Sequence, residues 1–411
     1  MLNRLWLGLF VAAAAAALGR WWIGGDAAVF GAIVASLFAM AKLSVDVMVL
    51  LFGTLTLWLG LLAIAERARL VQALARALGP VFSRLLPEVP PGHPALGLIT
   101  LNMAANMLGL DNAATPIGLK AMRELQSLNP SADTASNAQI MFLVLNASSL
   151  TLLPVSIFMY RAQQGAADPT LVFLPILLAT SASTLAGLFS VALVQRLPLR
   201  DARSLAWIAA GLLGYALLLA GLASLSAAAL ARVSDLAGNL MLFGVVMLFL
   251  LVGAWRRVPV YEAFIDGARQ GFEVARELLP YLVAMLCAVG ALRASGALDM
   301  VLHLVRWIVQ HLGLDTRFVD ALPTALVKPF SGSAARAMLI ETMHHDGVDS
   351  FPALTAATMQ GSTETTFYVL AVYFGAVGVR RARHAVACAL LADLAGVVAS
   401  ILVCYWFFGS R

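Results

Sequence analysis

Two groups of polar side chains stand in the middle of long apolar runs. They are Asn146, Ser148 and Ser149 within residues 140–160, and Gln360, Ser362, Thr363 and Glu364 within residues 351–377. Serine and threonine alone commonly hold membrane helices together. A carboxylate in mid-span, however, costs about 2.5–3.5 kcal/mol on insertion scales, so Glu364 is expected to be protonated or paired. These residue types favour a binding site for a small polar solute, with Glu364 coupling a cation or proton.

A second carboxylate, Asp393, lies in the apolar run 385–408. Two interpretations stay open for it. It either shares the coupling role of Glu364 or is the buried partner of Lys328 or Arg336.

Two further apolar segments, 102–116 and 322–336, are broken by Asn, Gly, Ser and Pro. Backbone polar groups cannot be left bare in lipid, so such breaks imply shielding by protein or a water-lined cavity. Paired breaks in two repeats are typical of a transporter site. The side chains offered to a solute are Asn102, Asn106 and Asn112 in the first segment, and Ser331 and Ser333 in the second. The alternative is that these residues only cap the starts of helices.

Other chemistries have little support in the sequence. No serine-hydrolase, zinc-protease, phosphate-loop or dinucleotide-binding motif is present, and the adjacent His344 and His345 point to different helix faces. Cys287, Cys388 and Cys404 lie in apolar stretches without a CxxC pair, as small buried residues do. We therefore expect no enzyme, no metal and no cofactor.

The composition is that of an integral membrane protein. Of 411 residues, 61% are hydrophobic and 12% charged, whereas soluble domains are about 25% charged. The net charge of +5 comes from Arg and Lys in short connections, where cytoplasmic loops collect them. The expected partner is the lipid bilayer rather than nucleic acid, and a homo-oligomer stays open.

Apolar runs of bilayer length predict about nine transmembrane helices. They are 5–23, 47–65, 140–160, 170–194, 205–225, 240–255, 280–292 with its flanks, 351–377 and 385–408. The first run is expected to be an uncleaved signal anchor. Segments 66–86 and 296–312 carry Arg or His among regularly spaced Leu and predict interfacial amphipathic helices.

The two halves of the chain show the same order of motifs. Asp111-Asn112-Ala113-Ala114-Thr115 matches Ser331-Gly332-Ser333-Ala334-Ala335, and Ala147-Ser148-Ser149-Leu150-Thr151 matches Gly361-Ser362-Thr363-Glu364-Thr365. Basic clusters follow residues 170–194 and 240–255 and precede the last run, whereas the loop 161–169 has one basic residue. Because equivalent loops then lie on opposite sides of the membrane, the copies are predicted to be inverted.

These motifs resemble a known family. The stretch Asn102-Met103-Ala104-Ala105-Asn106 and its surroundings resemble bacterial spore maturation protein A, and Ser331-Gly332-Ser333 with residues 359–370 resembles spore maturation protein B. Where that family often has Gly before Asn112, this chain has Asp111. The resemblance implies a natural fusion in the nucleoside recognition, or gate domain, superfamily. That superfamily includes concentrative nucleoside transporters, but the resemblance does not imply that nucleosides are the solute.

The sequence thus predicts an all-α integral membrane protein with about nine transmembrane helices, two re-entrant or broken segments and two inverted gate-like repeats. The repeats are 1–203 and 237–411, joined by a linking helix within 204–236. We expect a multi-pass protein of the bacterial cytoplasmic (inner) membrane that transports or gates a small polar solute. The alternatives are a membrane scaffold or regulator of the cell-envelope or spore-maturation type, and, with less support, an intramembrane enzyme.

Overall fold

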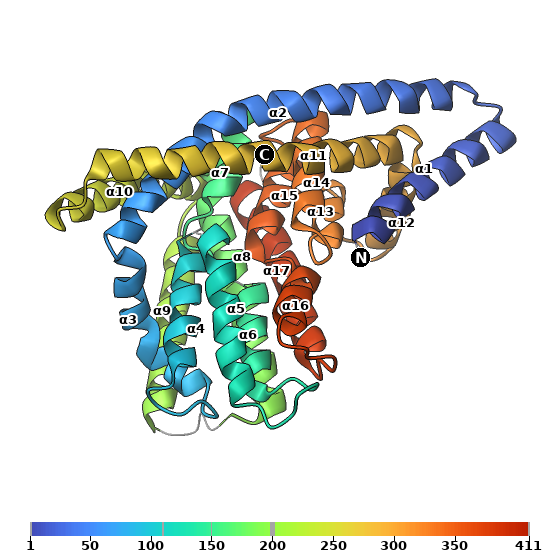
Figure 1. Cartoon of the computed structure of the whole chain (residues 1–411). Helices are drawn as coiled ribbons and strands as arrows, with labels where there is room; N and C mark the ends of the chain where they lie inside the picture. The colour runs from blue at the N-terminus through green and yellow to red at the C-terminus, as the bar shows by residue number, and fades with distance from the viewer. Residues whose placement is uncertain (1, 109–110, 149, 198–201, 410–411) are drawn as a thin grey trace. The chain divides into compact units, whose positions relative to one another are not determined.

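The computed structural model describes residues 2–108, 111–148, 150–197 and 202–409, which form helices joined by short connections (Figure 1). Among these residues there is no strand beyond one isolated bridge, between Thr134 and Arg381. The chain is an all-α membrane protein, as predicted. In its described part, the helices long and apolar enough to cross a membrane are Trp6–Gly24, Ala28–Arg67, Pro169–Gln195, Ala228–Trp255 and Ala385–Phe408, with Leu279–Ala294 plus Ala297–His311 as a sixth, bent by 67°. The number of nine stays a prediction.

Seven helices occur in the same order in each half of the chain. The first series is α2 (Ala28–Arg67), α3 (Leu70–Leu85), α4 (Pro94–Met107), α5 (Asp111–Ser127), α6 (Asn137–Ser148), α7 (Val155–Gln163) and α8 (Phe173–Gln195). The second is α11 (Val260–Ala294), α12 (Ala297–His311), α13 (Leu322–Val327), α14 (Gly332–Asp346), α15 (Phe351–Ser362), α16 (Thr366–Gly375) and α17 (Ala385–Phe408). Outside the series lie α1 (Leu2–Gly24), α9 (Ala202–Ala223), α10 (Ala227–Trp255) and two short 3₁₀ helices, Pro169–Val172 and Val319–Ala321.

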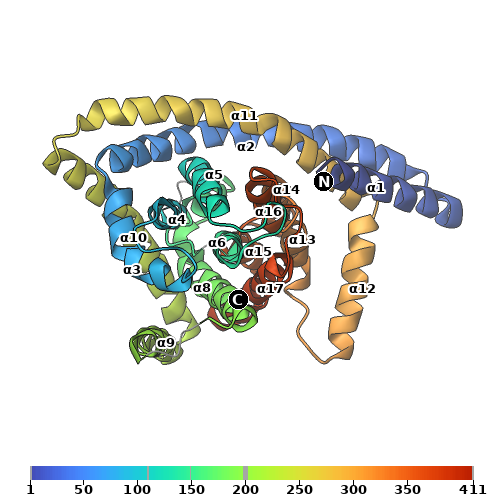
Figure 2. The same ribbon diagram turned by 60° about the horizontal axis from the view of Figure 1, so that its bottom comes forward.

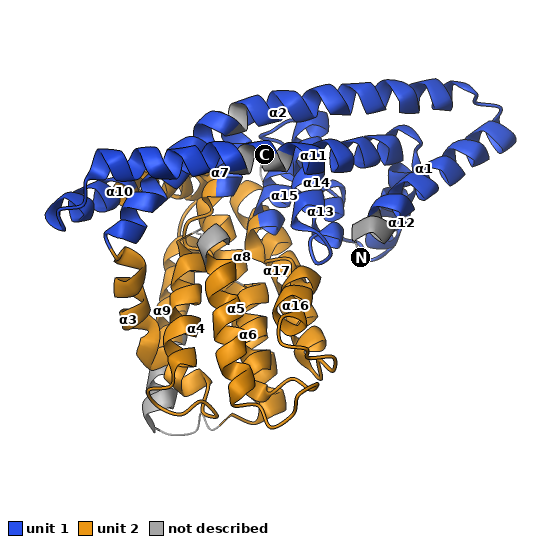
Figure 3. Ribbon diagram, in the orientation of Figure 1, with its two compact units in different colours: residues 1–68, 156–169, 246–360 blue, residues 69–155, 170–245, 361–411 orange. Residues whose placement is uncertain are grey.

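The chain forms two compact units, and each unit combines segments from both halves (Figure 3). Unit 1 contains residues 1–68, 156–169 and 246–360; unit 2 contains residues 69–155, 170–245 and 361–411. The predicted division at 203 and 236 follows the order of the repeats along the chain. Each compact unit, in contrast, is assembled from segments of both halves.

Unit 1 is built on a long antiparallel pair, α2 and α11, which lie side by side in two views (Figures 1 and 2). Glycines on α11 allow the close approach: a Cβ on Gly271 would lie 2.7 Å from the Cα of Thr56. The sequence predicted a helix only over 47–65, but α2 begins at Ala28. Lys42, Ser44 and Asp46 reduce the hydropathy there, yet packing against α11 continues beyond them to Met40 and Ser36, which both face Gly290.

A residue with positive φ separates each long helix from the amphipathic helix that follows. Arg69 (φ 53°) stands between α2 and α3, and Gly296 (φ 82°) between α11 and α12. The helices predicted over 66–86 and 296–312 are present as α3 and α12. Left-handed residues end the long helices because they cannot continue the helical hydrogen bonding.

Unit 2 has α6 at its centre, in contact with α4, α5, α8, α16 and α17 (Figure 2). Every residue of α6 from Ala138 to Ser148 is buried. A helix that is apolar on all sides is a buried helix, and this one presents its few polar groups to neighbouring helices.

Candidate functional site

The two apolar runs with polar centres are broken helices, not the continuous spans that the sequence predicted. The first ends as α6 at Ser148 and resumes as α7 at Val155; the second ends as α15 at Ser362 and resumes as α16 at Thr366. In the first break Pro154 lacks an N–H and disfavours helix in the residue before it. In the second, Ser and Thr side chains compete for backbone hydrogen bonds.

The two breaks meet in unit 2. The backbone N–H of Glu364 donates to the carbonyl oxygen of Ala147 at 2.8 Å, and Thr184 Oγ1 donates to the carbonyl of Ser148 at 3.3 Å. Backbone groups at each break are thus hydrogen-bonded either to the other break or to α8. Irregular backbone at membrane depth has to be shielded by protein in this way.

Helix α17 approaches the second break closely enough to bring a carboxylate to it. A Cβ on Gly396 would lie 2.8 Å from Cγ2 of Thr363 and 3.2 Å from Oγ of Ser362. One helical turn earlier, Asp393 is buried and its Oδ2 accepts a hydrogen bond from Thr366 Oγ1 at 2.7 Å. Ser183 on α8 donates to the Ala392 carbonyl at 2.9 Å.

Glu364 is the middle residue of the second break, between Thr363 and Thr365, and is only partly buried. Within the described part of unit 2 its carboxylate forms no ion pair. Its chain neighbours Thr363 and Thr365 are both buried, and carboxylate and hydroxyl oxygens are the ligand types that a hard cation prefers.

A cluster of three amides and a phenol joins the hairpin of α4 and α5 to α6 and α16. Asn106 Nδ2 donates to Asn146 Oδ1 at 3.0 Å, and Asn102 Nδ2 donates to the Ala114 carbonyl at 2.7 Å. The hydroxyl of Tyr373 lies 3.4 Å from both Asn102 Nδ2 and Asn146 Oδ1. The amides are therefore one another's partners, and solute binding to them stays a prediction.

The remaining predicted residues are located elsewhere or are not described. Ser331, Ser333 and Gln360 belong to unit 1. Ser331 Oγ accepts from the Ala334 N–H at 3.1 Å, which is the capping alternative, and Ser333 Oγ accepts from Arg336 at 3.1 Å. Ser149 and the side chain of Asn112 lie outside the described residues. The breaks thus bring together Ser148, Ser362, Thr363, Glu364 and Asp393, with Asn102, Asn106 and Asn146 in the same unit.

Unit 1 keeps its own polar contacts at the break between α13 and α14. Lys328 Nζ donates to the Gln360 carbonyl at 3.0 Å. The Gln360 Oε1 is buried and has no hydrogen-bond partner among the described residues, so it can accept a hydrogen bond from a solute or water.

Sequence reasoning missed Ser183, Thr184 and Tyr373. The first two belong to a run of hydroxyl residues inside the apolar α8. This signal is of the same kind as the polar residues in the middle of 140–160 and 351–377. Tyr373 gave no such signal, because an aromatic residue in an apolar helix is typical of a core.

The fold defines an all-helical membrane protein with two copies of a hairpin followed by a broken helix. The family model described as nucleoside recognition (Gate) matches residues 48–163 and 275–380, more than half of the chain, and each match contains one such copy. The chain belongs to this family.

Three relatives support this assignment. Spore maturation protein B of Bacillus subtilis is 45% identical over 161 residues, 39% of this chain and 89% of the relative. Spore maturation protein A of the same organism is 40% identical over 145 residues, 35% of this chain and 74% of the relative. The two cover different parts of the chain, as a fusion requires. Inner membrane protein YjiG of Escherichia coli K12 is 32% identical over 107 residues, 26% of this chain and 70% of the relative.

Proposed function

We propose that this chain is a gate-type transporter of the bacterial inner membrane that passes a small polar solute, with no enzymatic reaction. The observation that carries the proposal is the contact between the two helix breaks at Ala147 and Glu364. Each repeat contributes one interrupted helix, and transporters of this kind bind solute where such helices meet. The inner membrane is supported by the name of one relative, inner membrane protein YjiG.

Coupling is assigned to Glu364, with Asp393 as a second carboxylate near the same break. Glu364 is partly exposed, stands in non-helical backbone, and forms no ion pair within the described part of its unit. A carboxylate that serves only as half of a buried pair would be enclosed with its cation. The surroundings of Glu364 suit exchange of a proton or cation better.

The rival function is a membrane scaffold or regulator, as the names of the spore maturation relatives allow. Its support is the amide cluster of Asn102, Asn106 and Asn146, which is satisfied inside the protein. In that case the polar groups hold helices together, and no solute crosses.

The Glu364→Gln variant separates these functions. A metabolite comparison between a deletion strain and its parent identifies the solute, and uptake into proteoliposomes is then measured across pH and in Na⁺ versus K⁺. We expect the Tm to be nearly unchanged and the ion dependence of uptake to be lost, because the amide keeps the shape but cannot ionise. Glu262→Gln, at an exposed position of α11, is the matched control and should behave as wild type. A large fall in Tm with no change in ion response would favour the scaffold.

The inverted arrangement is tested separately by reporter fusions. Reporters after Arg203 and Arg383 should read cytoplasmic and one after Gly165 periplasmic, because positive loops stay inside. Finding the positions after Gly165 and Arg383 on the same side of the membrane would contradict the inversion, whatever the solute.

A further inference from the structure

One face of α2 carries two charged residues in the middle of an apolar surface. Lys42 and Asp46 are both exposed, and residues four apart share a helix face. On the opposite face of the same stretch, Met40 packs on Gly290 of α11 and Ser44 is buried. The two charges therefore point away from α11 and lie at the surface of the chain.

The surface around these charges is apolar. Large apolar side chains are exposed before, between and after the two charges along the helix; they are Phe30, Val34, Phe38, Val45 and Val49. An apolar helix face in a membrane protein can meet lipid chains as well as protein. The two charges decide between these occupants.

Lys42 and Asp46 do not fit contact with lipid chains. Charged side chains within transmembrane segments almost always face other protein groups or pair with one another. These two form no ion pair, either with each other or with any other residue that the structure describes. A lysine can extend its ammonium toward the headgroups, but the short side chain of an aspartate inside a 40-residue helix cannot. Asp46 therefore needs a cationic partner that its own chain does not supply.

The charges do not mark the membrane boundary either. If the bilayer surface lay at Lys42 and Asp46, one of the flanking stretches, 28–41 or 47–65, would be in water. Neither stretch contains a charged residue, and α2 is apolar enough to cross a membrane. The apolar part 28–65 is about twice as long as the hydrocarbon layer is thick, so it crosses that layer at a tilt. Asp46, near the middle of this part, is then far from both surfaces.

We propose that this face of α2 binds the same face of a second copy of the chain in a two-fold symmetric dimer. In such a dimer the same surface patch of each copy forms the contact. Lys42 of one copy pairs with Asp46 of the other, and the symmetry forms the reverse pair at the same time. The face is complementary to itself because its two charges are opposite and lie about one helical turn apart. The dimer is separate from the helix breaks and does not depend on the proposed transport.

The apolar side chains complete the interface. Phe38 and Val45 lie beside the charges on the exposed surface, so in the dimer they surround the two ion pairs and keep water from them. A pair of this kind is more strongly attractive in a dry environment than in water. Two copies therefore satisfy in the membrane what one copy leaves unpaired.

The test moves charges between the copies. Lys42→Asp places two negative charges on the face, and Asp46→Lys places two positive charges there. Each variant produced alone should lose the dimer, because like charges then meet. Produced together with different tags, the two variants should copurify, because each chain now meets the opposite charges. Pairing within one helix or with lipid headgroups would not be restored in this way, since each chain still carries like charges.

The dimer is measured on the full chain in mild detergent, by copurification of two differently tagged copies and by native mass spectra. We expect dimers for wild type and for the double variant Lys42→Asp/Asp46→Lys. Glu262→Lys, a charge reversal at an exposed position of α11, is the matched control and should keep the dimer. The Tm of each variant checks that it is folded.

A second measurement does not depend on the charge variants. Val45→Cys, an exposed residue between the two charges, should give more cross-linked dimer than wild type when isolated membranes are treated with a bifunctional maleimide. The absence of this cross-link would contradict the proposal even if a charge variant failed to fold. A wild type without dimers, a folded single variant that still dimerises alone, or folded variants that do not copurify when produced together would each overturn it.

Discussion

Arg161 shows how much a single side chain can change the interpretation of a loop. From the sequence it is the one basic residue of the loop 161–169. In the structure it is fully buried in unit 1, and its guanidinium donates to the carbonyls of Asp168, Pro169 and Val348 and to the Asp349 carboxylate at 2.8–3.2 Å. A buried, paired arginine is not a solvated loop charge. Its loop therefore has even less of the cytoplasmic signature than the sequence suggests.

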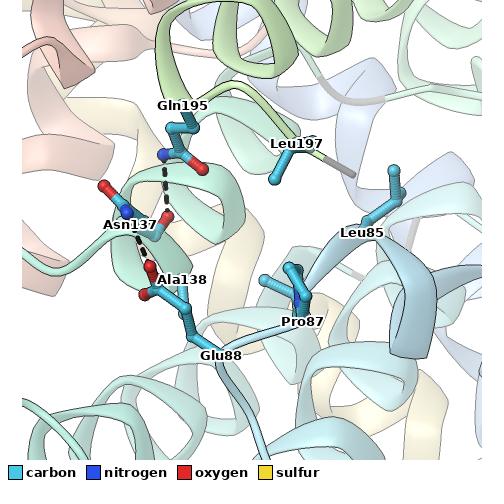
Figure 4. Close-up of a pocket in the computed structure, with 8 residues that line it drawn as sticks. Leu85, Pro87, Glu88, Asn137, Ala138, Gln195 and Leu197 are labelled. Atoms are coloured by element: carbon cyan, nitrogen blue, oxygen red, sulfur yellow. Dashed lines mark hydrogen bonds between the residues drawn. The ribbon is translucent and has the colours of Figure 1, made fainter. Parts of the chain in front are cut away.

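At the same scale, His384 is the residue from which we expect a pH dependence of stability. It lies in the connection before α17, and burial, followed by the charge of Arg383, lowers its pKa from 6.5. The Nε2 of Gln195 donates to the Asn137 carbonyl at 3.0 Å and lies 3.1 Å from His384 Nε2 (Figure 4 shows the first contact). Because an amide NH₂ group can only donate, His384 Nε2 accepts from Gln195 and the ring is neutral. Charged groups linked to the same region include Glu88, which accepts a hydrogen bond from Asn137, and Asp133, which forms an ion pair with Arg381 and whose carbonyl accepts from the N–H of Arg380.

The sign of the pH effect follows from linkage. A histidine whose folded pKa lies below its unfolded value stabilises the fold above about pH 6.5, and this stability is lost as the pH falls. We expect the Tm of wild type to fall on acidification below pH 6.5 by more than that of His384→Gln, which cannot titrate. Equal acid sensitivity in both proteins would contradict the assignment.

At the scale of elements, the α2–α11 pair depends on glycine contacts that leave no room for a methyl group. Gly271 meets the backbone of Leu55 and Thr56, and Gly267 meets the backbone of Leu59. Backbone atoms cannot rotate away as a side chain can. The two helices would have to separate to accept a larger residue.

We therefore expect Gly271→Ala to lower the stability by about 1–3 kcal/mol, the usual cost of overpacking. Gly53→Ala is the matched control, because Gly53 lies on α2 with open space around it. Alanine there should be neutral or gain up to about 1 kcal/mol from helix propensity. The measurement is the Tm of both variants in the same detergent. A Gly271→Ala protein as stable as Gly53→Ala would show that the helices are not in close contact.

Some elements could be predicted from the sequence and others could not. The breaks within 102–116 and 322–336 could be predicted, because Asn, Gly, Ser and Pro interrupt the apolar sequence there. The breaks after Ser148 and Ser362 were hidden, because apolar runs on both sides of a break sum to one bilayer length. The start of α2 could not be predicted because polar residues inside the helix reduce its hydropathy. Its length depends on contacts with residues of α11, which are over 200 positions away in the sequence.

The carboxylates and hydroxyls of the candidate site could be predicted from the sequence, but the hydrogen-bond partners of its side chains could not. Glu364 and Asp393 are conspicuous in apolar sequence. Which groups satisfy Asn102 or Asn146 depends on where Tyr373 lies. A Cβ on Gly118 would lie 2.6 Å from Cζ of Tyr373, so the phenol reaches the amides because position 118 has no side chain. No local pattern shows this.

At the scale of the whole molecule, neither half of the chain contains a complete compact unit. Unit 1 needs residues 246–360 together with 1–68 and 156–169, and unit 2 needs residues 361–411 together with 69–155 and 170–245. The halves that resemble spore maturation proteins A and B are therefore structurally interdependent in this chain.

Splitting the chain between Leu197 and Ala202 tests this interdependence. Each fragment produced alone should aggregate or be degraded, because buried polar groups such as Asn146 would lose neighbours supplied by the other half. Produced together, the fragments should copurify and melt cooperatively near the Tm of the intact chain. A cooperative, detergent-stable fold of either fragment alone would contradict the interdependence.

The assembly of each compact unit from both halves of the chain also has a consequence for biosynthesis. Helices α3 to α6 are made early, but α16 and α17, which complete their unit, follow the end of α6 by some 200 residues. At about 5–20 residues per second, the usual rate of synthesis, α6 waits on the order of 10–40 s for its final neighbours. During that interval Asn146 and Ser148 have to be shielded by the insertion machinery or by transient helix contacts. Slowing translation between α6 and α16 should lengthen this exposure and lower the yield of folded protein.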